Sequence, residues 1–265
     1  MNTYIIDSIR TPIGNFGGTL KDIRTDDLAA IPIRELIKRT KIEPSKIDDV
    51  ILGCANQAGE DNRNIARMAS LLAGIPFSVP GETINRLCAS GMSAVINAHR
   101  AIQTGDGNLF IAGGIENMTR GPWVISKVSK AFGRDAQMFD SSFGWRFINP
   151  KMKELYGVDG MGTTAENLAE KYNISREDQD NFAYHSQLKA YKAQSLGRLS
   201  EEIVAVEIPQ RKKEPILFEH DEFIKGNTKV KVLAKLRTAF KKENGTVTAG
   251  NSSGLNAVSY THLRA

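Results

Sequence analysis

The sequence is predicted to pass from a strand to a helix within Thr83-Ile84-Asn85-Arg86-Leu87-Cys88-Ala89-Ser90-Gly91-Met92-Ser93-Ala94-Val95. Pro80 and Gly81 open an extended run that ends near Leu87. Beyond it, four apolar residues and a histidine recur at three- and four-residue intervals, the period of an amphipathic helix. They are Met92, Val95, Ile96, His99 and Ile102. Cys88 is therefore expected between a strand and the first turn of a helix.

Cys88 is the candidate nucleophile of this chain. A helix N-terminus offers unpaired amide groups and the positive end of the helix dipole, and both favour the thiolate, the reactive form of cysteine. The small residues Ala89, Ser90 and Gly91 would let a ligand or a second backbone come close. The alternative is that Cys88 is a small buried apolar residue, and the residues alone leave both interpretations open.

Strands and helices are predicted to alternate over the first 118 residues. Short strands are expected at 4–7, 50–55 and 109–112, and helices at 25–39 and 65–73. Thr25 is suited to cap the first helix, and Pro32 inside it predicts a kink or a later start. The run 50–55 is apolar throughout, as in a strand covered on both faces, which places Cys54 in the core. The alternation predicts a layered α/β fold with a mostly parallel sheet.

The composition changes after Met118. From 119 to 247 the chain is richer in charge, and two helices there are predicted to begin with Thr163-x-x-Glu166 and Ser175-x-x-Asp178, both of the capping-box form. Residues 246–251 then return to strand character. The expected domains are an α/β domain at 1–118 completed by 248–256, an inserted α-rich domain at 119–247, and a tail at 257–265.

Composition also indicates the cellular compartment of the protein and the kinds of ligand that it does not bind. No run approaches the eighteen apolar residues of a membrane span, and the N-terminus enters a strand pattern without a targeting segment. Two cysteines in 265 residues fit a reducing cytosol and exclude a four-cysteine zinc site. We therefore expect a cytoplasmic protein that binds neither membrane nor metal.

The stretch from Lys225 to Lys242 contains seven basic residues and no acidic one. Such a patch suits a phosphorylated ligand, and a solvated face without a role is the alternative. No aromatic interleaving or nucleic-acid motif accompanies it, so we do not expect nucleic acid as a partner.

A nucleophilic cysteine usually needs a base within hydrogen-bond reach. His99 lies eleven residues along the same predicted helix, about 16 Å away at about 1.5 Å per residue, which is too far. His185 and His220 lie in the inserted domain, where surface or packing roles are more common, and His262 lies in the tail. The sequence thus offers a nucleophile without an identifiable partner.

Five blocks of the sequence resemble blocks of the thiolase family, in the family's order. They are Arg10-Thr11-Pro12-Ile13-Gly14, Asn85–Met92, Gly113–Arg120, Met161–Asn167 and Thr248–Gly254. The likeness runs from residue 3 to 256. Two further stretches, 53–64 and 144–150, are similar to the thiolases that cleave 3-oxoadipyl-CoA in aromatic-compound degradation.

The resemblance implies a thiolase-like fold and a two-step acyl transfer. Cys88 would attack the keto carbon of 3-oxoadipyl-CoA, acetyl-CoA would leave, and CoA would then collect the succinyl group from the sulfur. Coenzyme A is thus a substrate, and no permanently bound cofactor is implied. The alternatives are a general 3-ketoacyl-CoA (acetoacetyl-CoA) thiolase, a decarboxylating condensing enzyme, and a thiolase-like CoA-binding protein without catalysis.

The resemblance also implies which residues bind the ligand. The inserted domain resembles the family's CoA-holding loop domain, and the positions expected to contact CoA are Met161, Lys225, Phe240, Ala249 and Ser253. Lys225 stands where a relative carries arginine, a residue better suited to stacking on adenine. The far carboxylate of a dicarboxylic acyl chain needs a cation or several donors. Arg146 and Arg63 are the candidates, with an ordinary surface role as the alternative.

After Asn256 the sequence departs from the family. The family continues with a second α/β half, whereas residues 257–265 resemble no part of it and are expected to be a junction artefact. The absent half would bring a histidine to activate Cys88, a second cysteine as acid/base, and oxyanion donors. We expect a fragment with negligible turnover, in which an apolar face of the Cys88 helix stays uncovered. For the full-length protein the family implies a homodimer or homotetramer.

Overall fold

The computed structural model describes residues 2–256. The chain divides into two compact units, each described here by itself. The first comprises the chain up to Pro122 together with Ser200–Glu222, and the second comprises Trp123–Leu199 and Phe223–Leu255. The expected tail at 257–265 lies outside the described residues.

A three-stranded parallel sheet forms the centre of the first unit. Its strand order is β2 (Gly81–Ile84), β1 (Asp49–Gly53), β3 (Phe110–Gly114). Val50 pairs with Gly81 on one side and with Ile111 on the other. Along the chain, α2 (Ile65–Leu72) connects β1 to β2, and α3 (Ser90–Thr104) connects β2 to β3. Parallel strands require crossover connections of this kind.

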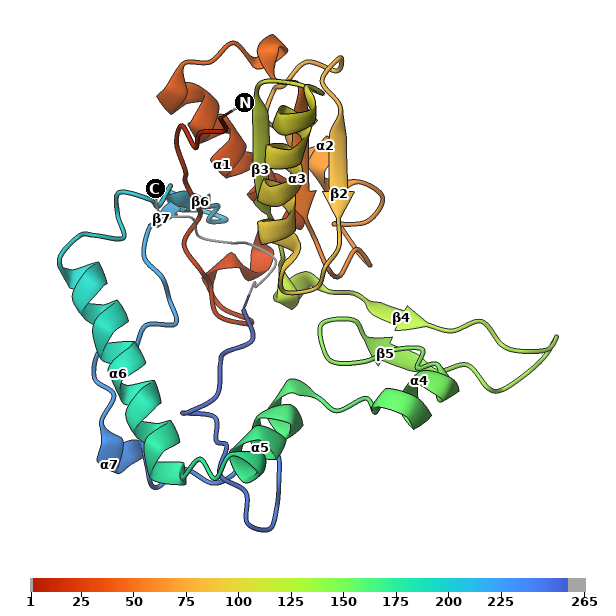
Figure 1. The fold of residues 1–265 in the computed structure, drawn as a ribbon, viewed down its shortest axis with the longest axis vertical. Helices are drawn as coiled ribbons and strands as arrows, with labels where there is room; N and C mark the ends of the chain where they lie inside the picture. Colours follow the sequence, from red (N-terminus) through yellow and green to blue (C-terminus); the bar gives the residue numbers. More distant parts are fainter. Residues whose placement is uncertain (1, 257–265) are drawn as a thin grey trace. The chain divides into compact units, whose positions relative to one another are not determined.

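Helices cover both faces of this sheet (Figure 1). Successive strand residues point to opposite faces. Val50 and Leu52 therefore join the core that includes residues of α1 (Thr25–Thr40) and α2, whereas Ile51 packs with residues of α3. The predicted layered α/β fold with a parallel sheet is confirmed. Three short 3₁₀ helices, Thr19–Asp22, Pro44–Lys46 and Met118–Arg120, lie in its connections.

A hairpin from later in the chain belongs to the first unit. β6 (Val206–Ile208) and β7 (Ile216–Phe218) pair antiparallel, and both ends of β6 are buried in the core of the sheet. After the hairpin, Asp221 accepts two hydrogen bonds from the guanidinium of Arg10, at 2.7 and 2.8 Å. Residues 200–222 thus lie with the first unit, although the sequence had grouped them with the insertion.

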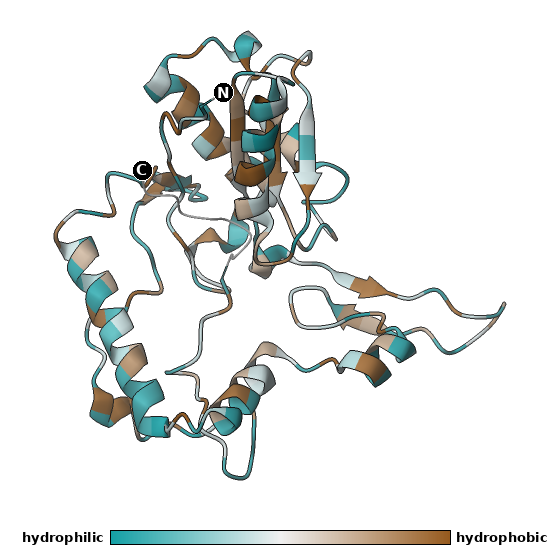
Figure 2. Cartoon of the chain, viewed as in Figure 1, coloured by the Kyte–Doolittle hydropathy of each residue, from teal (hydrophilic) through white to brown (hydrophobic). Residues whose placement is uncertain are grey.

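The second unit carries one β-hairpin and several helices. Its elements are β4 (Trp123–Ile125), β5 (Met138–Asp140), α4 (Pro150–Tyr156), α5 (Met161–Lys171), α6 (Arg176–Ser195) and α7 (Val230–Leu233). Among the residues of α6, all of which the structure describes, only Asp180 is buried. Figure 2 shows α6 as largely hydrophilic. The buried side chain of α6 is therefore a carboxylate and not part of an apolar stripe.

Three local predictions in the first unit need correction. Residues 4–7 form no strand among the described residues, and Tyr4 and Ile6 are exposed, because no described strand pairs with them. Helix α1 begins at Thr25 and continues through Pro32, so the expected late start is wrong. Thr25 is the first helical residue and not the cap. The carboxylate of Glu60 accepts the hydrogen bond of its amide at 3.0 Å.

In the second unit the sequence predicted one helix cap correctly. Ser175 caps α6, and its hydroxyl oxygen accepts from the amide of Asp178 at 3.0 Å. Helix α5 begins at Met161 after Gly160, so Thr163 is not its cap. Residues 246–251 form no strand, because side chains take the backbone donors that a strand would need, as described below.

Across residues 2–256, the structure contains no helix that combines the length and the apolar character needed to cross a membrane.

Candidate functional site

Cys88 lies at the carboxyl end of the parallel sheet. It follows β2, and Ala89 caps α3 directly after it. Its side chain is exposed, whereas Cys54 at the end of β1 is fully buried. In open α/β sheets, ligands bind outside the carboxyl ends of the strands. The predicted placement of Cys88 between a strand and a helix start, and of Cys54 in the core, is confirmed.

Gly53 sets how closely α3 approaches the sheet. A Cβ atom at Gly53 would lie 2.5 Å from the amide nitrogen of Gly91 and 2.6 Å from the Cβ of Ser90. Only a residue without a side chain therefore allows the end of β1 to contact the first turn of α3. Ser90 is itself fully buried in this contact. The same contact fixes the helix start that carries Cys88.

Cys54 belongs to a buried polar cluster below this edge of the sheet. Its thiol lies 3.6 Å from Asp61, and the ligand atoms of Cys54, Asp61 and Glu116 all lie within 4.8 Å of one another. Burial, together with the charges of Glu116 and Asp61, raises the pKa of the Cys54 thiol. Main-chain amides satisfy the carboxylates: Asp61 accepts from Gln57 and Gly59, at 3.1 and 2.8 Å. This cluster shapes the loop after β1 and keeps Cys54 an unreactive thiol.

In the second unit, the predicted CoA-contacting residues lie on adjoining segments. Met161 begins α5 and is 80% exposed. The ring of Phe240 covers the next residue, Gly162, so closely that no Cβ would fit there. Ala249 and Ser253, further along the chain, are exposed. Met161 and Phe240 are therefore two exposed apolar side chains near the start of α5.

Lys225 is held against α6. Its amide donates to Oε1 of Gln187 at 2.7 Å, and its ammonium lies 5.4 Å from the centre of the Phe223 ring. The ring of Tyr191 packs on the next residue, Gly226, with 2.5 Å between its Cε2 and the position a Cβ would occupy. A pocket of about 410 Å³ lies beside this segment, lined by Tyr184 and residues 226–231. The exposed ammonium of Lys225 can therefore meet an anionic group.

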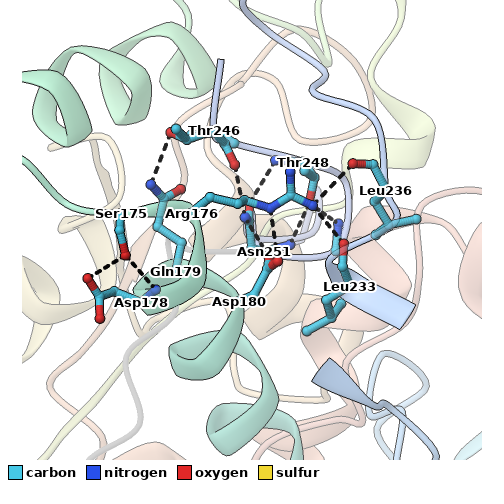
Figure 3. A network of polar contacts seen from close by, with 12 residues as sticks. Ser175, Arg176, Asp178, Gln179, Asp180, Leu233, Leu236, Thr246, Thr248 and Asn251 are labelled. Carbon is cyan, nitrogen blue, oxygen red and sulfur yellow. Dashed lines mark hydrogen bonds and ion pairs between the residues drawn. The ribbon is translucent and has the colours of Figure 1, made fainter. Parts of the chain in front are cut away.

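A network centred on Asp180 connects α6 to the segments that carry these residues (Figure 3). Oδ1 of Asp180 accepts from the side-chain amide of Asn251 at 2.9 Å, and Oδ2 accepts from Nε of Arg176 at 2.9 Å. Arg176 donates in turn to the carbonyl oxygens of Leu233 and Leu236, at 2.7 and 3.1 Å. The segments before Phe240 and around Ala249 are thus bonded to one helix.

Asn251 and Thr248 close the turn that carries Ala249. Oδ1 of Asn251 accepts from the Thr248 amide at 2.7 Å, and the Thr248 hydroxyl oxygen accepts from the amides of Gly250 and Asn251, both at 3.2 Å. These bonds use the backbone donors that a strand would have needed. Arg176 and Asp180 are four residues apart on one helix, a spacing that allows them to pair. No signal in the sequence indicated the bond between Asp180 and Asn251, because residues 71 apart meet only in the folded chain.

Glu166 fastens the preceding residues to α5. Its carboxylate accepts from the amides of Thr246, at 2.9 and 3.0 Å, and Val247, at 2.9 Å, and from the Thr246 hydroxyl at 3.0 Å. Burial opposes its charge, but the hydrogen bonds outweigh burial and hold the pKa of Glu166 below its ordinary value. A carboxylate with a depressed pKa stabilises the folded state above its ordinary pKa, and this contribution is lost as the pH falls through the folded-state value.

Replacing Glu166 with glutamine should lower the free energy of unfolding at pH 7 by about 2 kcal/mol, since hydrogen bonds to a charged acceptor are lost. The difference between wild type and variant should shrink as the pH falls below about 4. Urea titrations at pH 7 and pH 3.5 measure it. Glu170→Gln, one turn further along α5 and paired with the exposed Lys241, is the control and should change little. A pH-independent difference would contradict the assignment.

The two arginines proposed for a terminal carboxylate lie in different units. Arg63 belongs to the first unit, is exposed, and has a positive φ of 63°. Arg146 belongs to the second unit, is half-buried, and donates to the Ser141 carbonyl at 3.2 Å. Each guanidinium has five N–H donors in a planar arrangement.

Each of the three described histidines contacts a nearby side chain. Nδ1 of His99, on α3, lies 3.0 Å from the Thr3 hydroxyl, and the ring of His185 packs on Tyr184 with 5.2 Å between centroids. His220 is 3.8 Å from its neighbour Glu219. His262 lies outside the described residues.

Comparisons with known proteins agree with this architecture. The family model "Thiolase, N-terminal domain" matches residues 3–259. The chain is 56% identical to the 3-oxoadipyl-CoA/3-oxo-5,6-dehydrosuberyl-CoA thiolase of Escherichia coli, over 96% of the chain and 63% of that protein. It is 54% identical to a beta-ketoadipyl-CoA thiolase of Acinetobacter baylyi, over 96% of the chain and 64% of that protein.

Among solved structures, the crystal structure of the Bacillus anthracis acetyl-CoA acetyltransferase superposes with a TM-score of 0.82 at 39% sequence identity. The match covers 95% of this chain and 62% of that one. The chain therefore spans less than two thirds of the length of these relatives. With a family model matched over nearly its whole length and a sheet that places Cys88 at its carboxyl edge, the chain belongs to the thiolase family and carries that family's N-terminal domain.

Proposed function

We propose that this chain is the N-terminal part of a thiolase that cleaves 3-oxoadipyl-CoA with CoA to succinyl-CoA and acetyl-CoA. The observation that carries the proposal is the exposed Cys88 between β2 and α3, in a chain 54–56% identical to proteins named for that substrate. Acetoacetyl-CoA thiolysis is the second candidate, favoured by the structural match to an acetyl-CoA acetyltransferase.

The reaction divides into two acyl transfers at one sulfur atom. The Cys88 thiolate attacks the C3 ketone carbon, and the C2–C3 bond breaks, so that the electron pair leaves on C2 and a proton completes acetyl-CoA. The succinyl group remains as a thioester of Cys88. The thiol of CoA then loses its proton and attacks this thioester, and succinyl-CoA leaves while Cys88 regains its thiolate. We place the groups that move these protons in the C-terminal part of the full-length protein, so the 265-residue chain alone should not turn over.

The second unit is proposed to hold CoA. Met161 and Phe240 offer apolar contact to the pantetheine arm, and Ala249 and Ser253 lie on the turn that Asp180 and Asn251 order. Lys225 supplies a cation for a phosphate. In this proposal CoA is a substrate and no cofactor is resident. We further propose a cytoplasmic enzyme that assembles as a homodimer or homotetramer.

The test is a thiolysis assay on the full-length protein. Acyl-CoA products from 3-oxoadipyl-CoA and from acetoacetyl-CoA are separated and quantified at equal concentrations of enzyme and CoA. The proposal expects stoichiometric succinyl-CoA and acetyl-CoA, and a higher kcat/KM on 3-oxoadipyl-CoA. A preference for acetoacetyl-CoA would select the second candidate, and CoA binding without cleavage of either would overturn both.

Substitution of Arg146 and Arg63 tests which residue causes the preference for 3-oxoadipyl-CoA over acetoacetyl-CoA. If one of them binds the far carboxylate, its replacement by alanine should lower kcat/KM on 3-oxoadipyl-CoA about 10- to 100-fold, the worth of a charge-assisted hydrogen bond, and leave acetoacetyl-CoA unaffected. Arg198→Ala, at an exposed position after α6, is the control. An unchanged ratio of the two kcat/KM values in both variants would leave Arg146 and Arg63 as structural arginines.

A further inference from the structure

The residue before Cys88 has a backbone conformation that leucine rarely adopts. Leu87 has a φ of 49°, in the left-handed region that non-glycine residues disfavour. Its side chain is 69% exposed, so little packing compensates for the conformation. Hydrogen bonds around the turn must therefore hold it. Strained backbone next to a reactive side chain points to a functional requirement.

Those hydrogen bonds come from Asn85 and Ser90. Oδ1 of Asn85 accepts from the Leu87 amide at 2.9 Å. The Ser90 hydroxyl donates to the Leu87 carbonyl at 2.6 Å and accepts from the Arg86 amide at 2.8 Å. Ser90 is fully buried and part of α3, so its bonds anchor the turn to the helix. Cys88 lies between these two anchors.

Asn85 also ties the turn to the strands behind it. Its Nδ2 donates to the carbonyl of Ala55, two residues after β1, at 3.1 Å. The amides of Ala55 and Asn56 donate to the carboxylate of Glu116, at 2.9 and 3.2 Å. Glu116 is buried just after β3. Asn85 therefore joins the Cys88 turn to the carboxyl end of β1, and Glu116 connects that segment to the end of β3.

We propose that Asn85 is a positioning residue for Cys88, which clamps the strained turn so that the thiol is presented in the geometry of attack. The inference rests on the proposed function in taking Cys88 as the nucleophile. Asparagine suits this role because one rigid amide group supplies both an acceptor for Leu87 and a donor for Ala55. Aspartate keeps the acceptor only, and alanine keeps neither.

The kinetic test uses the full-length protein. Asn85→Ala should lower kcat for 3-oxoadipyl-CoA thiolysis about 10- to 100-fold, the range for a misplaced reacting atom, with KM for both substrates within about twofold. Asn85→Asp should recover part of the loss. Leu87→Val, which resists the left-handed conformation, should lower kcat more than Leu87→Gly, which adopts it freely. Rates are expressed per mole of folded enzyme, determined for each variant by the protection of the buried Cys54 from alkylation, so that loss of folded protein does not count.

Asn108→Ala is the matched control, because Asn108 is exposed and its hydrogen bond to Asp48 comes from the main chain. A kcat within twofold of wild type for Asn85→Ala, or a rise in KM that accounts for the whole loss, would overturn the proposal. A structural role alone would change the yield of folded enzyme and would leave kcat per mole of folded enzyme unchanged.

A second measurement separates this inference from the proposed function. Alkylation of Cys88 in the 265-residue chain is followed by mass spectrometry, and the buried Cys54 reports whether the fold is intact. Asn85→Ala should slow Cys88 alkylation at least threefold while Cys54 stays protected, because the turn loses the hydrogen bond that the Leu87 amide donates to Asn85 and no longer holds Cys88 in one position. If Cys54 is labelled in Asn85→Ala, that variant has lost its fold, and the alkylation rate of Cys88 is then compared between the wild type and Asn85→Asp. Equal rates contradict positioning, whereas absent thiolysis by the wild type would overturn only the proposed function.

Discussion

Replacing Cys88 with alanine is expected to abolish thiolysis by the full-length protein, lowering kcat by about ten-thousand-fold or more. The reason is that both acyl transfers pass through this sulfur, so no alternative path remains once it is removed. Because Cys88 is exposed, the fold should be unaffected. The assay is the release of succinyl-CoA at saturating CoA, together with the urea midpoint of the same variant.

Cys54→Ala provides the contrast. Cys54 is fully buried, and its thiol lies beside Asp61, so its removal leaves a small cavity at the end of β1. The variant should lose about 1 kcal/mol of stability and keep its thiolysis rate. An inactive Cys54→Ala beside an active Cys88→Ala would reverse the assignment of the nucleophile.

Replacing Gly53 with alanine should have the largest effect on stability, about 3 kcal/mol, at the upper end of the cost of overpacking. The added Cβ would lie 2.5 Å from the Gly91 amide nitrogen and 2.6 Å from the Cβ of Ser90, and neither the helix backbone nor a buried side chain can move cheaply. The first turn of α3 must then shift away from β1. Because Cys88 precedes that turn, the rate of Cys88 alkylation should change as well.

Gly113→Ala is the control for Gly53→Ala. Gly113 lies on the neighbouring strand β3, opposite Leu52, and a Cβ there would meet only the Leu52 side chain, at an ordinary 3.7 Å. Urea unfolding of both variants gives the comparison. Equal loss of stability in the two, or an unperturbed Gly53→Ala, would mean that α3 does not rest on the end of β1.

The parts of the fold that the sequence predicted well are those set by local patterns. The apolar period after Cys88 predicted α3, the unbroken run around Leu52 predicted β1, and Ser175 was correctly identified as the cap of α6. Each depends on residues within a few positions of one another. Sequence periodicity reports such neighbours directly.

The failures share a different physical cause. Residues 4–7 and 246–251 have the composition of strands, but a strand exists only where a partner takes its hydrogen bonds. Around Thr246 the side chain of Glu166, 80 residues earlier, takes those bonds instead. Likewise, the hairpin at 206–218 lies with the first unit because residues of β6 pack in the core of that unit. No pattern of neighbouring residues in the sequence indicates this long-range contact.

The candidate site divides in the same way. The placement of Cys88 between a strand and a helix could be predicted, because that placement has a local signature, whereas its role as the nucleophile was indicated by resemblance. The contacts of Asn85, Glu116 and Asp180 could not be predicted, because folding brings their partners near: the backbone of Ala55 for Asn85 and Glu116, and the side-chain amide of Asn251 for Asp180. The CoA-contacting residues were indicated by resemblance, and their assignment remains a prediction.

Cys88 is expected to carry the acyl group between the two half-reactions, and peptide mapping of the trapped intermediate can detect it there. The full-length protein is mixed with 3-oxoadipyl-CoA in the absence of free CoA, quenched in acid, and digested with trypsin, which releases residues 87–100 as one peptide. We expect a succinyl group on Cys88 in that peptide, its removal on addition of CoA, and an unmodified Cys54. Product formation with no acyl group on Cys88, or with the group on another residue, would contradict it.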